Sequence, residues 1–119
     1  MTGSADASVL RAYFESIDAG DLESVFDLFA DDIEYHRPGF GTYSGIDEFK
    51  EFYLEDRPIE DGAHHIDWML VDDDRIAVRG TFTGRIDGEE VSFGIADFHR
   101  FDETGKIVER WSYTNRGEV

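Results

Sequence analysis

The chain has 119 residues, a length that allows one hydrophobic core and is too short for two. The sequence has 28 Asp and Glu against 11 Lys and Arg, which gives a net charge of −17. This charge argues against nucleic-acid binding through a basic face and against binding to anionic membranes. The sequence contains no cysteine, which excludes disulfides, thiolate catalysis and Cys-ligated metals.

The N-terminal part of the sequence has the apolar period of helices. Apolar residues recur on one face over 8–18, and Gly20 is expected to end this helix. Asp21 is expected to cap a second helix, whose apolar positions are Leu22, Val25, Phe26 and Phe29.

A short strand is expected over 33–36, ending before Pro38 and Gly39, with a loop after it. The stretch 44–47 resembles a capping box that opens a third helix. The apolar side of this helix carries Phe49, Phe52 and Tyr53, and we expect Pro58 and Gly62 to end it.

From residue 64 onward apolar and polar residues alternate, which indicates strands. We expect strands over 64–71, 75–86, 90–101 and 106–115, with turns at 72–74, 87–88 and 103–105. Asp87 and Gly88 form a type I′ hairpin signal. Gly80 and Gly84 would either open space in the pocket or relieve the bending of the sheet. Three helices followed by an antiparallel meander are an α+β order, and a strongly bent sheet would leave a cavity against the helices.

The acidic composition favours a protein adapted to concentrated salt, and the absence of targeting signals in the sequence favours a cytoplasmic location. Only Lys50 and Lys106 are lysines, and an acidic, lysine-poor surface stays hydrated where salt screens its self-repulsion. We therefore expect molar KCl to raise the melting temperature. No apolar run approaches a membrane span, and the first residues lack the basic and apolar regions of a signal peptide.

Four stretches carry a family resemblance: YFESIDAGD at 13–21, LFADD at 28–32, GIDEF at 45–49 and IADFHRFDETGKI at 95–107. In order and spacing, over nearly the whole chain, they resemble ketosteroid isomerases and SnoaL-like polyketide cyclases of the NTF2-like superfamily. The resemblance implies a single SnoaL-like domain over 1–119. It also implies a cone in which three N-terminal helices pack on a strongly curved antiparallel or mixed sheet that encloses a pocket.

The resemblance also implies site residues. Ketosteroid isomerases stabilise a dienolate with a Tyr of the first helix and a protonated Asp of the third strand, and these positions match Tyr13 and Asp97. The Tyr that supports the first one matches Tyr53. The general base of these isomerases falls on Arg37, whose guanidinium cannot abstract a proton at neutral pH, so steroid isomerisation is not expected.

The surroundings of Asp97 can also be argued from alternation alone. Phe93, Ile95, His99 and Phe101 share its strand face, and burial among apolar groups raises the pKa of a carboxyl group unless a partner compensates. A raised pKa would let Asp97 donate a hydrogen bond to an oxyanion or act as a general acid. If Asp97 is instead ionised and paired with Arg37 or His99, it would orient groups or act as a base. If this face is exposed, Asp97 is simply solvated.

The histidines are candidates for proton transfer. His36 stands beside Arg37 and is expected at the cavity mouth, where it could replace the missing base, and His99 shares a face with Asp97. His64 and His65 open a strand, so one points inward and the other outward. His36, His65 and His99 with Asp97 could form a two-His-one-carboxylate metal set, but no ligand-like spacing supports it, and we expect no metal.

The remaining candidate residues are expected either to line the pocket or to lie on the outer face of the sheet. We expect substrate contacts from Arg37, Tyr53, Trp68, Phe82, Phe93 and Ile95. In the last strand Arg110, Ser112 and Thr114 alternate with Trp111 and Tyr113, and alternation leaves open which set faces the pocket. If Trp111 and Tyr113 are exposed, they suit homodimerisation through the outer sheet face, a common arrangement in the superfamily.

The leading functional prediction is cofactor-independent acid–base chemistry, of isomerase or cyclase type, on an apolar carbonyl-containing substrate. Tyr13 and Asp97 would polarise or protonate the oxygen, Tyr53 would support Tyr13, and His36 or His99 would move the proton. The alternatives are a non-catalytic binding protein for a small hydrophobic or anionic ligand, which Arg37 favours, and a dimeric assembly module.

Overall fold

The computed structural model describes residues 5–37, 41–56 and 59–115. The helical elements are α1 (Ala7–Ala19), α2 (Leu22–Asp27), α3 (Ile46–Glu51) and the π-helical turn η1 (Phe52–Asp56). The strands are β1 (Phe29–Arg37), β2 (Gly41–Ser44), β3 (Ile59–Asp72), β4 (Arg75–Ile86), β5 (Glu89–Phe101) and β6 (Ile107–Thr114). The expected α+β class is confirmed.

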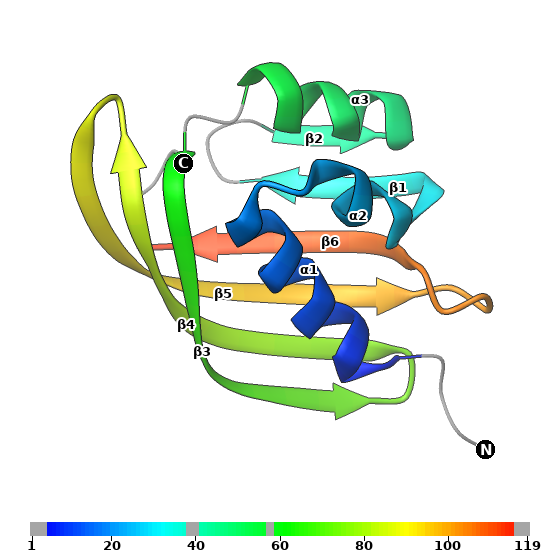
Figure 1. The fold of residues 1–119 in the computed structure, drawn as a ribbon. Coiled ribbons are helices and arrows are strands. Elements are labelled where there is room, and N and C mark those ends of the chain that lie inside the picture. The colour runs from blue at the N-terminus through cyan, green and yellow to red at the C-terminus, as the bar shows by residue number, and fades with distance from the viewer. Residues whose placement is uncertain (1–4, 38–40, 57–58, 116–119) are drawn as a thin grey trace.

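In the described part of the chain six strands form one sheet in the order β2-β1-β6-β5-β4-β3. β1 runs parallel to β6, and the other neighbouring strands are antiparallel. The long strands β3, β4 and β5 bend sharply toward the side on which α1 and α2 lie, and α3 lies beside β2 (Figure 1). The sheet is mixed, curved and unclosed, as the expected cone requires.

The first two helices each begin at an Asp cap, of which Asp21 was predicted and Asp6 was not. The Asp6 carboxylate accepts a hydrogen bond from the Ser8 backbone N–H at 2.9 Å, and Gly20 ends α1 in the left-handed region at φ 77°. The Asp21 carboxylate accepts from the Ser24 backbone N–H at 3.3 Å, which confirms Asp21 as the cap of α2. The expected helical place of Phe29 is wrong, because α2 ends at Asp27 and Phe29 pairs with Ile107 as the first residue of β1.

The segment between the helices and the long strands differs most from expectation. The strand expected over 33–36 is part of the nine-residue β1, and β2 replaces the expected loop because it pairs with β1 as an edge strand. The N-cap of α3 is Gly45, with no side-chain cap, although the Ser44 backbone N–H donates to the Glu48 carboxylate at 3.0 Å. The expected capping box is therefore wrong.

The turns and strands of the second half follow the prediction more closely. β4 has the expected bounds, and Asp87 and Gly88 both have positive φ, 53° and 80°, as a type I′ turn requires. The expected stop at Gly62 is wrong, because β3 begins at Ile59 and its first residues pair with the end of β4. Pro38, Gly39 and Pro58 lie outside the described residues.

Gly80 is the residue that lets β3 and β4 approach at the bend. A Cβ atom at Gly80 would lie 2.3 Å from the backbone oxygen of His65, closer than side chains tolerate. The β3–β4 register shifts between Ile66 and Trp68, directly beside this contact. A bulge and a glycine thus produce the curvature of the sheet.

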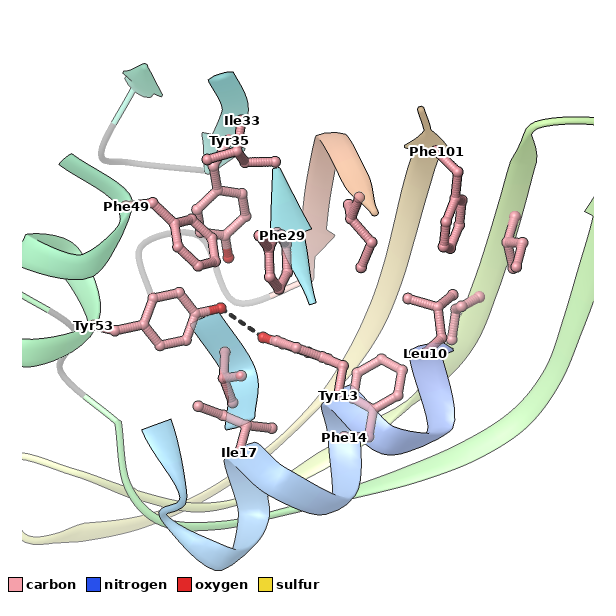
Figure 2. Close-up of a cluster of buried hydrophobic side chains, with 14 of the residues drawn as sticks. Leu10, Tyr13, Phe14, Ile17, Phe29, Ile33, Tyr35, Phe49, Tyr53 and Phe101 are labelled. Atoms are coloured by element: carbon pink, nitrogen blue, oxygen red, sulfur yellow. Dashed lines mark hydrogen bonds between the residues drawn. The ribbon is translucent and has the colours of Figure 1, made fainter. Parts of the chain in front are cut away.

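Two apolar clusters fill the concave side. The larger one joins α1, α3 and the sheet, and Figure 2 shows its aromatic residues Tyr13, Phe29, Tyr35, Phe49 and Tyr53 packed together. The smaller one lies on the bent part of the sheet and contains Phe82, Ile86, Phe93 and Ile95. The cavity described below lies between these clusters. None of the helices in the described residues is long and apolar enough to cross a bilayer.

Candidate active site

A small cavity lies between α1 and the concave face of the sheet. Its volume is ≈ 30 Å³, about the room of one water molecule. One wall is apolar and the other is polar. The lining residues are Tyr13, Arg37, His64, Phe82, Phe93, Ile95, Asp97, Arg110, Ser112 and Thr114.

Asp97 forms a buried ion pair with Arg110 on the polar wall. The Arg110 Nη2 atom lies 3.1 Å from the Asp97 Oδ2 atom, and each side chain is 4% exposed. Burial opposes ionisation of Asp97, but the Arg110 charge, the neighbouring His99 and the Ser112 hydroxyl outweigh it and hold the pKa of the carboxyl below its ordinary 3.8. The expected raised pKa is therefore wrong, and the ionised alternative holds with Arg110, not Arg37, as the ion-pair partner. Asp97 is ionised at neutral pH and accepts hydrogen bonds only.

Arg110 also holds two tyrosine hydroxyls. Its Nη1 atom donates to the Tyr13 hydroxyl and, at 3.1 Å, to the Tyr53 hydroxyl. These two hydroxyls are 2.5 Å apart and point toward each other in Figure 2. The resemblance implied that Tyr53 supports Tyr13, and the two side chains do lie in contact. Burial lowers the pKa of Arg110, but the tyrosine oxygens and Asp97 outweigh it and raise that pKa well above its ordinary value.

A second buried cation lies beside a third tyrosine. The Arg37 Nη1 atom donates to the Tyr35 hydroxyl, and its guanidinium stacks 4.8 Å from the Phe52 ring centre. The Tyr35 hydroxyl also lies 3.3 Å from the Ser112 hydroxyl. Burial opposes the phenolate form, but Arg37 and then Arg110 outweigh it and lower the pKa of Tyr35 to about 8. Sequence reasoning missed Tyr35, although alternation with Ile33 and Arg37 would have placed it inward.

The expected place of His36 at the cavity mouth is wrong. Because Tyr35 and Arg37 point inward, His36 points to the opposite face of the sheet, where it stacks on Trp111 with ring centres 5.4 Å apart. Its Nε2 atom lies 3.1 Å from Glu109. His36 therefore does not contact the cavity.

His99 is buried beneath the site and does not line the cavity. It is 1% exposed, and its Nδ1 atom lies 3.3 Å from the backbone oxygen of Ile76. Burial, followed by the charge of Arg110, lowers the pKa of His99 to about 3, so the ring is neutral at neutral pH. Its Nε2 atom is buried and has no hydrogen-bond partner among the residues that the structure describes.

The remaining expected substrate contacts divide into two groups. Arg37, Phe82, Phe93 and Ile95 line the cavity, while Tyr53 reaches it through Tyr13. The expected placement of Trp68 in the pocket is wrong, because its side chain is 47% exposed beside apolar residues of the outer sheet face.

The last strand supplies two cavity residues that sequence reasoning could not place. Arg110 and Ser112 are buried in the concave face, while Tyr113 is exposed on the outer face.

In the described ranges no three His, Cys, Asp or Glu side chains gather as a metal site would require. His36 and His65 lie apart from His99, since each bonds a threonine hydroxyl on the outer surface.

Solved structures share this fold. An NTF2-like protein of unknown function from Burkholderia pseudomallei has a TM-score of 0.84 and 22% identity, covering 97% of this chain and 92% of that one. An LEH-like epoxide hydrolase from M. tuberculosis has a TM-score of 0.78 and 17% identity, covering 91% and 80%. IdmH from Streptomyces antibioticus, provisionally described as a polyketide cyclase, has a TM-score of 0.76 and 20% identity, covering 92% and 91%.

These TM-scores show a common fold, and a common fold at such low identity does not establish a common chemistry. A search among curated proteins finds no match. The family model of the SnoaL-like domain matches residues 10–110, which is most of the sequence. The chain therefore belongs to the SnoaL-like domain family.

Proposed function

We propose that this protein is a cofactor-independent enzyme that polarises the oxygen of a small carbonyl compound and moves a proton on a neighbouring carbon. The observation that carries this proposal is the hydrogen-bonding state of the Tyr13 hydroxyl. Its oxygen accepts from Arg110 and lies 2.5 Å from the Tyr53 hydroxyl. When Tyr53 donates to it as well, both lone pairs of Tyr13 are used, and its own proton is available to a ligand oxygen in the cavity.

The electrostatics of the site favour a developing negative charge. Arg110 lines the cavity and donates to the Tyr13 hydroxyl, and Arg37 lines the same cavity. Both guanidinium groups lie in a buried, low-dielectric environment, where preorganised donors stabilise an oxyanion far better than water does. Asp97 acts in this proposal by holding Arg110 in place, and not as the hydrogen-bond donor that the family resemblance implied.

The apolar wall would hold the rest of the substrate once the side chains around the ≈ 30 Å³ cavity move apart to admit it. Phe82 and Phe93 pack with ring centres 5.2 Å apart, and Ile95 continues their surface. An oxygen at Tyr13 would place the attached carbon skeleton toward these side chains. The proposed substrate is therefore small and apolar, with one carbonyl group, and reacts by isomerisation, cyclisation or a related step.

Exchange of α-protons with deuterated solvent tests the proposal. Cyclic ketones and enones are incubated with the protein in D₂O, and loss of the α-proton signal is followed by NMR. We expect catalysed exchange with at least one compound, and Tyr13→Phe should slow it about 10²–10³-fold, the usual cost of losing one oxyanion donor. Tyr113→Phe, on the exposed outer face, is the matched control and should keep the wild-type rate.

One observation favours a second candidate, a binding protein for a small carboxylate. Arg37 lines the cavity, and the guanidinium group of an arginine can bind a carboxylate through two parallel hydrogen bonds. Saturable binding of an apolar carboxylate by calorimetry, with no exchange of any ketone or enone, would replace the enzyme proposal with this one.

We also propose that a second copy of the chain covers the outer sheet face. A surface hollow of ≈ 500 Å³ lies there, and its wall is mostly apolar. Large apolar side chains that are at least 45% exposed gather on this side of β3, β5 and β6, namely Trp68, Leu70, Phe98 and Tyr113. A twofold dimer would bury the same patch on both subunits.

A further inference from the structure

The cavity still lacks an assigned proton acceptor. Asp97 is held as an ionised partner of Arg110, and Arg37 cannot accept a proton. His36 points away from the cavity, and His99 is buried beneath it. One titratable side chain that lines the cavity has no role so far, and that side chain is His64.

We propose that His64 is the general base of this cavity and that Asp18 is its positioning residue. The inference rests on the proposed function, because it names the group that takes the proton in that chemistry. Asp18 lies in the last turn of α1, and His64 lies near the start of β3, 46 residues later. The fold brings them together where α1 packs against β3 (Figure 1).

The hydrogen bonds between the two residues determine the protonation of the ring. The His64 Nδ1 atom is 2.6 Å from Asp18 Oδ1, and the His64 backbone N–H donates to Asp18 Oδ2 at 2.8 Å. A carboxylate only accepts hydrogen bonds, so the proton of the neutral ring is on Nδ1. The Nε2 atom is then left with a free lone pair, which is the arrangement of an oriented general base.

The ring also packs against two phenylalanine rings. Its centre lies 5.0 Å from the Phe14 ring centre and 5.0 Å from that of Phe82, and the His64 side chain is 8% exposed. In the residues that the structure describes, no hydrogen bond to Nε2 is found, whereas Nδ1 and the backbone N–H are both bonded to Asp18. His64 and Tyr13 line the same cavity.

This arrangement supplies a balanced proton transfer. Nε2 takes the proton from the carbon next to the carbonyl, the C–H bonding pair becomes the C=C bond of an enolate, and the carbonyl π pair moves to the oxygen held by Tyr13. The imidazolium returns a proton to the same carbon, or to another carbon of the enolate, after exchange with solvent. Asp18 stabilises the imidazolium, and the reaction consumes no oxidant, reductant or cofactor.

The first experiment compares neighbouring histidines in the deuterium-exchange assay. His64→Gln should lower the exchange rate about 10²–10⁴-fold while ketone binding is kept. His65→Gln is the matched control, because His65 is exposed, bonds Thr83 at 3.2 Å and should keep the wild-type rate. Imidazole added to a folded His64→Ala variant should restore part of the lost rate.

The second experiment combines the ring tautomer, which is read without substrate, with the kinetics of an Asp18 variant. Nitrogen-15 NMR of the His64 ring at neutral pH should show a protonated Nδ1 and an unprotonated Nε2. Asp18→Asn should change this signature and lower kcat more than it raises KM, by roughly 10- to 10⁴-fold, the upper value being the cost of a wrong tautomer in hydrolase triads.

The outcomes separate this inference from the proposed function. Exchange by the wild type that persists in His64→Gln, or an Nε2-protonated tautomer in the wild type, overturns the role of His64 alone. Absence of exchange with every ketone and enone overturns the proposed function and, with it, the role of His64. Exchange that is lost in His64→Gln and kept in His65→Gln supports both.

Discussion

The Asp97 carboxylate and the Arg110 guanidinium lie 3.1 Å apart on neighbouring strands, each 4% exposed. Asp97 is opposite Ser112 in the β5–β6 register and Arg110 is opposite His99, so the ion pair is diagonal across the two strands. The pair keeps Asp97 ionised and holds Arg110 against the hydroxyls of Tyr13 and Tyr53. The charge of the whole cavity therefore depends on it.

Removing one partner of this pair should be costly. We expect Arg110→Met to lower the free energy of unfolding by about 3–5 kcal/mol, because it leaves the Asp97 charge buried without its partner. Urea denaturation at neutral pH measures the change. The double variant Arg110→Met with Asp97→Leu should lose less than the single one. A double variant that loses the sum of the two single effects would contradict a direct interaction.

The buried ring of His99 should make stability depend on pH below about 6.5. The folded protein holds the pKa of His99 at about 3 against an ordinary value of 6.5, so between these values only the unfolded chain binds the proton. This contribution to stability is complete above about pH 6.5 and falls as the pH decreases toward 3. Urea denaturation at about pH 7 and about pH 5 should show a smaller loss for His99→Gln than for the wild type. Equal losses in the two proteins would show that His99 is protonated in both states or in neither.

Two glycines in neighbouring strands give a matched test of the bend. Gly80→Ala should destabilise the protein by about 1–3 kcal/mol, because its Cβ atom would lie 2.3 Å from the His65 backbone oxygen. Gly94→Ala should be nearly neutral, because its nearest neighbours are side-chain atoms of Asn115 at 3.7 Å or more. Thermal melts of the two variants decide the point. Equal melting temperatures would mean that close approach at Gly80 does not limit the curvature.

The proposed dimer predicts which exposed apolar residues matter for association. Phe98→Lys and Tyr113→Lys place charges in the outer-face patch, and each should shift the protein from dimer to monomer in sedimentation equilibrium. Leu54→Lys is the control, because Leu54 is 63% exposed on η1, away from that face, and should leave the mass unchanged. A monomeric wild type would overturn the dimer proposal.

Local patterns predicted much of this fold because they depend on near neighbours along the chain. Gly20 ends α1 and Asp21 caps α2 as predicted, and the positive φ angles of Asp87 and Gly88 follow from the turn type. Alternation predicted that Asp97 shares a strand face with Phe93 and Ile95, and the family resemblance predicted that this face lines a pocket; every second residue of β5 is buried there. β2 was missed because a four-residue edge strand has too little alternation of its own and exists only by pairing with β1.

By itself, the sequence determined the α+β class, the bounds of β4, the family resemblance and which residues of β5 share a face with Asp97. The tertiary structure alone decided that Arg110 faces inward and Trp111 does not, because alternation along a strand has two equivalent phases. The structure also decided the charge of Asp97 and the pairing of Asp18 with His64, 46 residues away. A pKa and a ring tautomer depend on charges and hydrogen bonds through space, and a linear pattern does not record which groups the fold brings within 3 Å of one another.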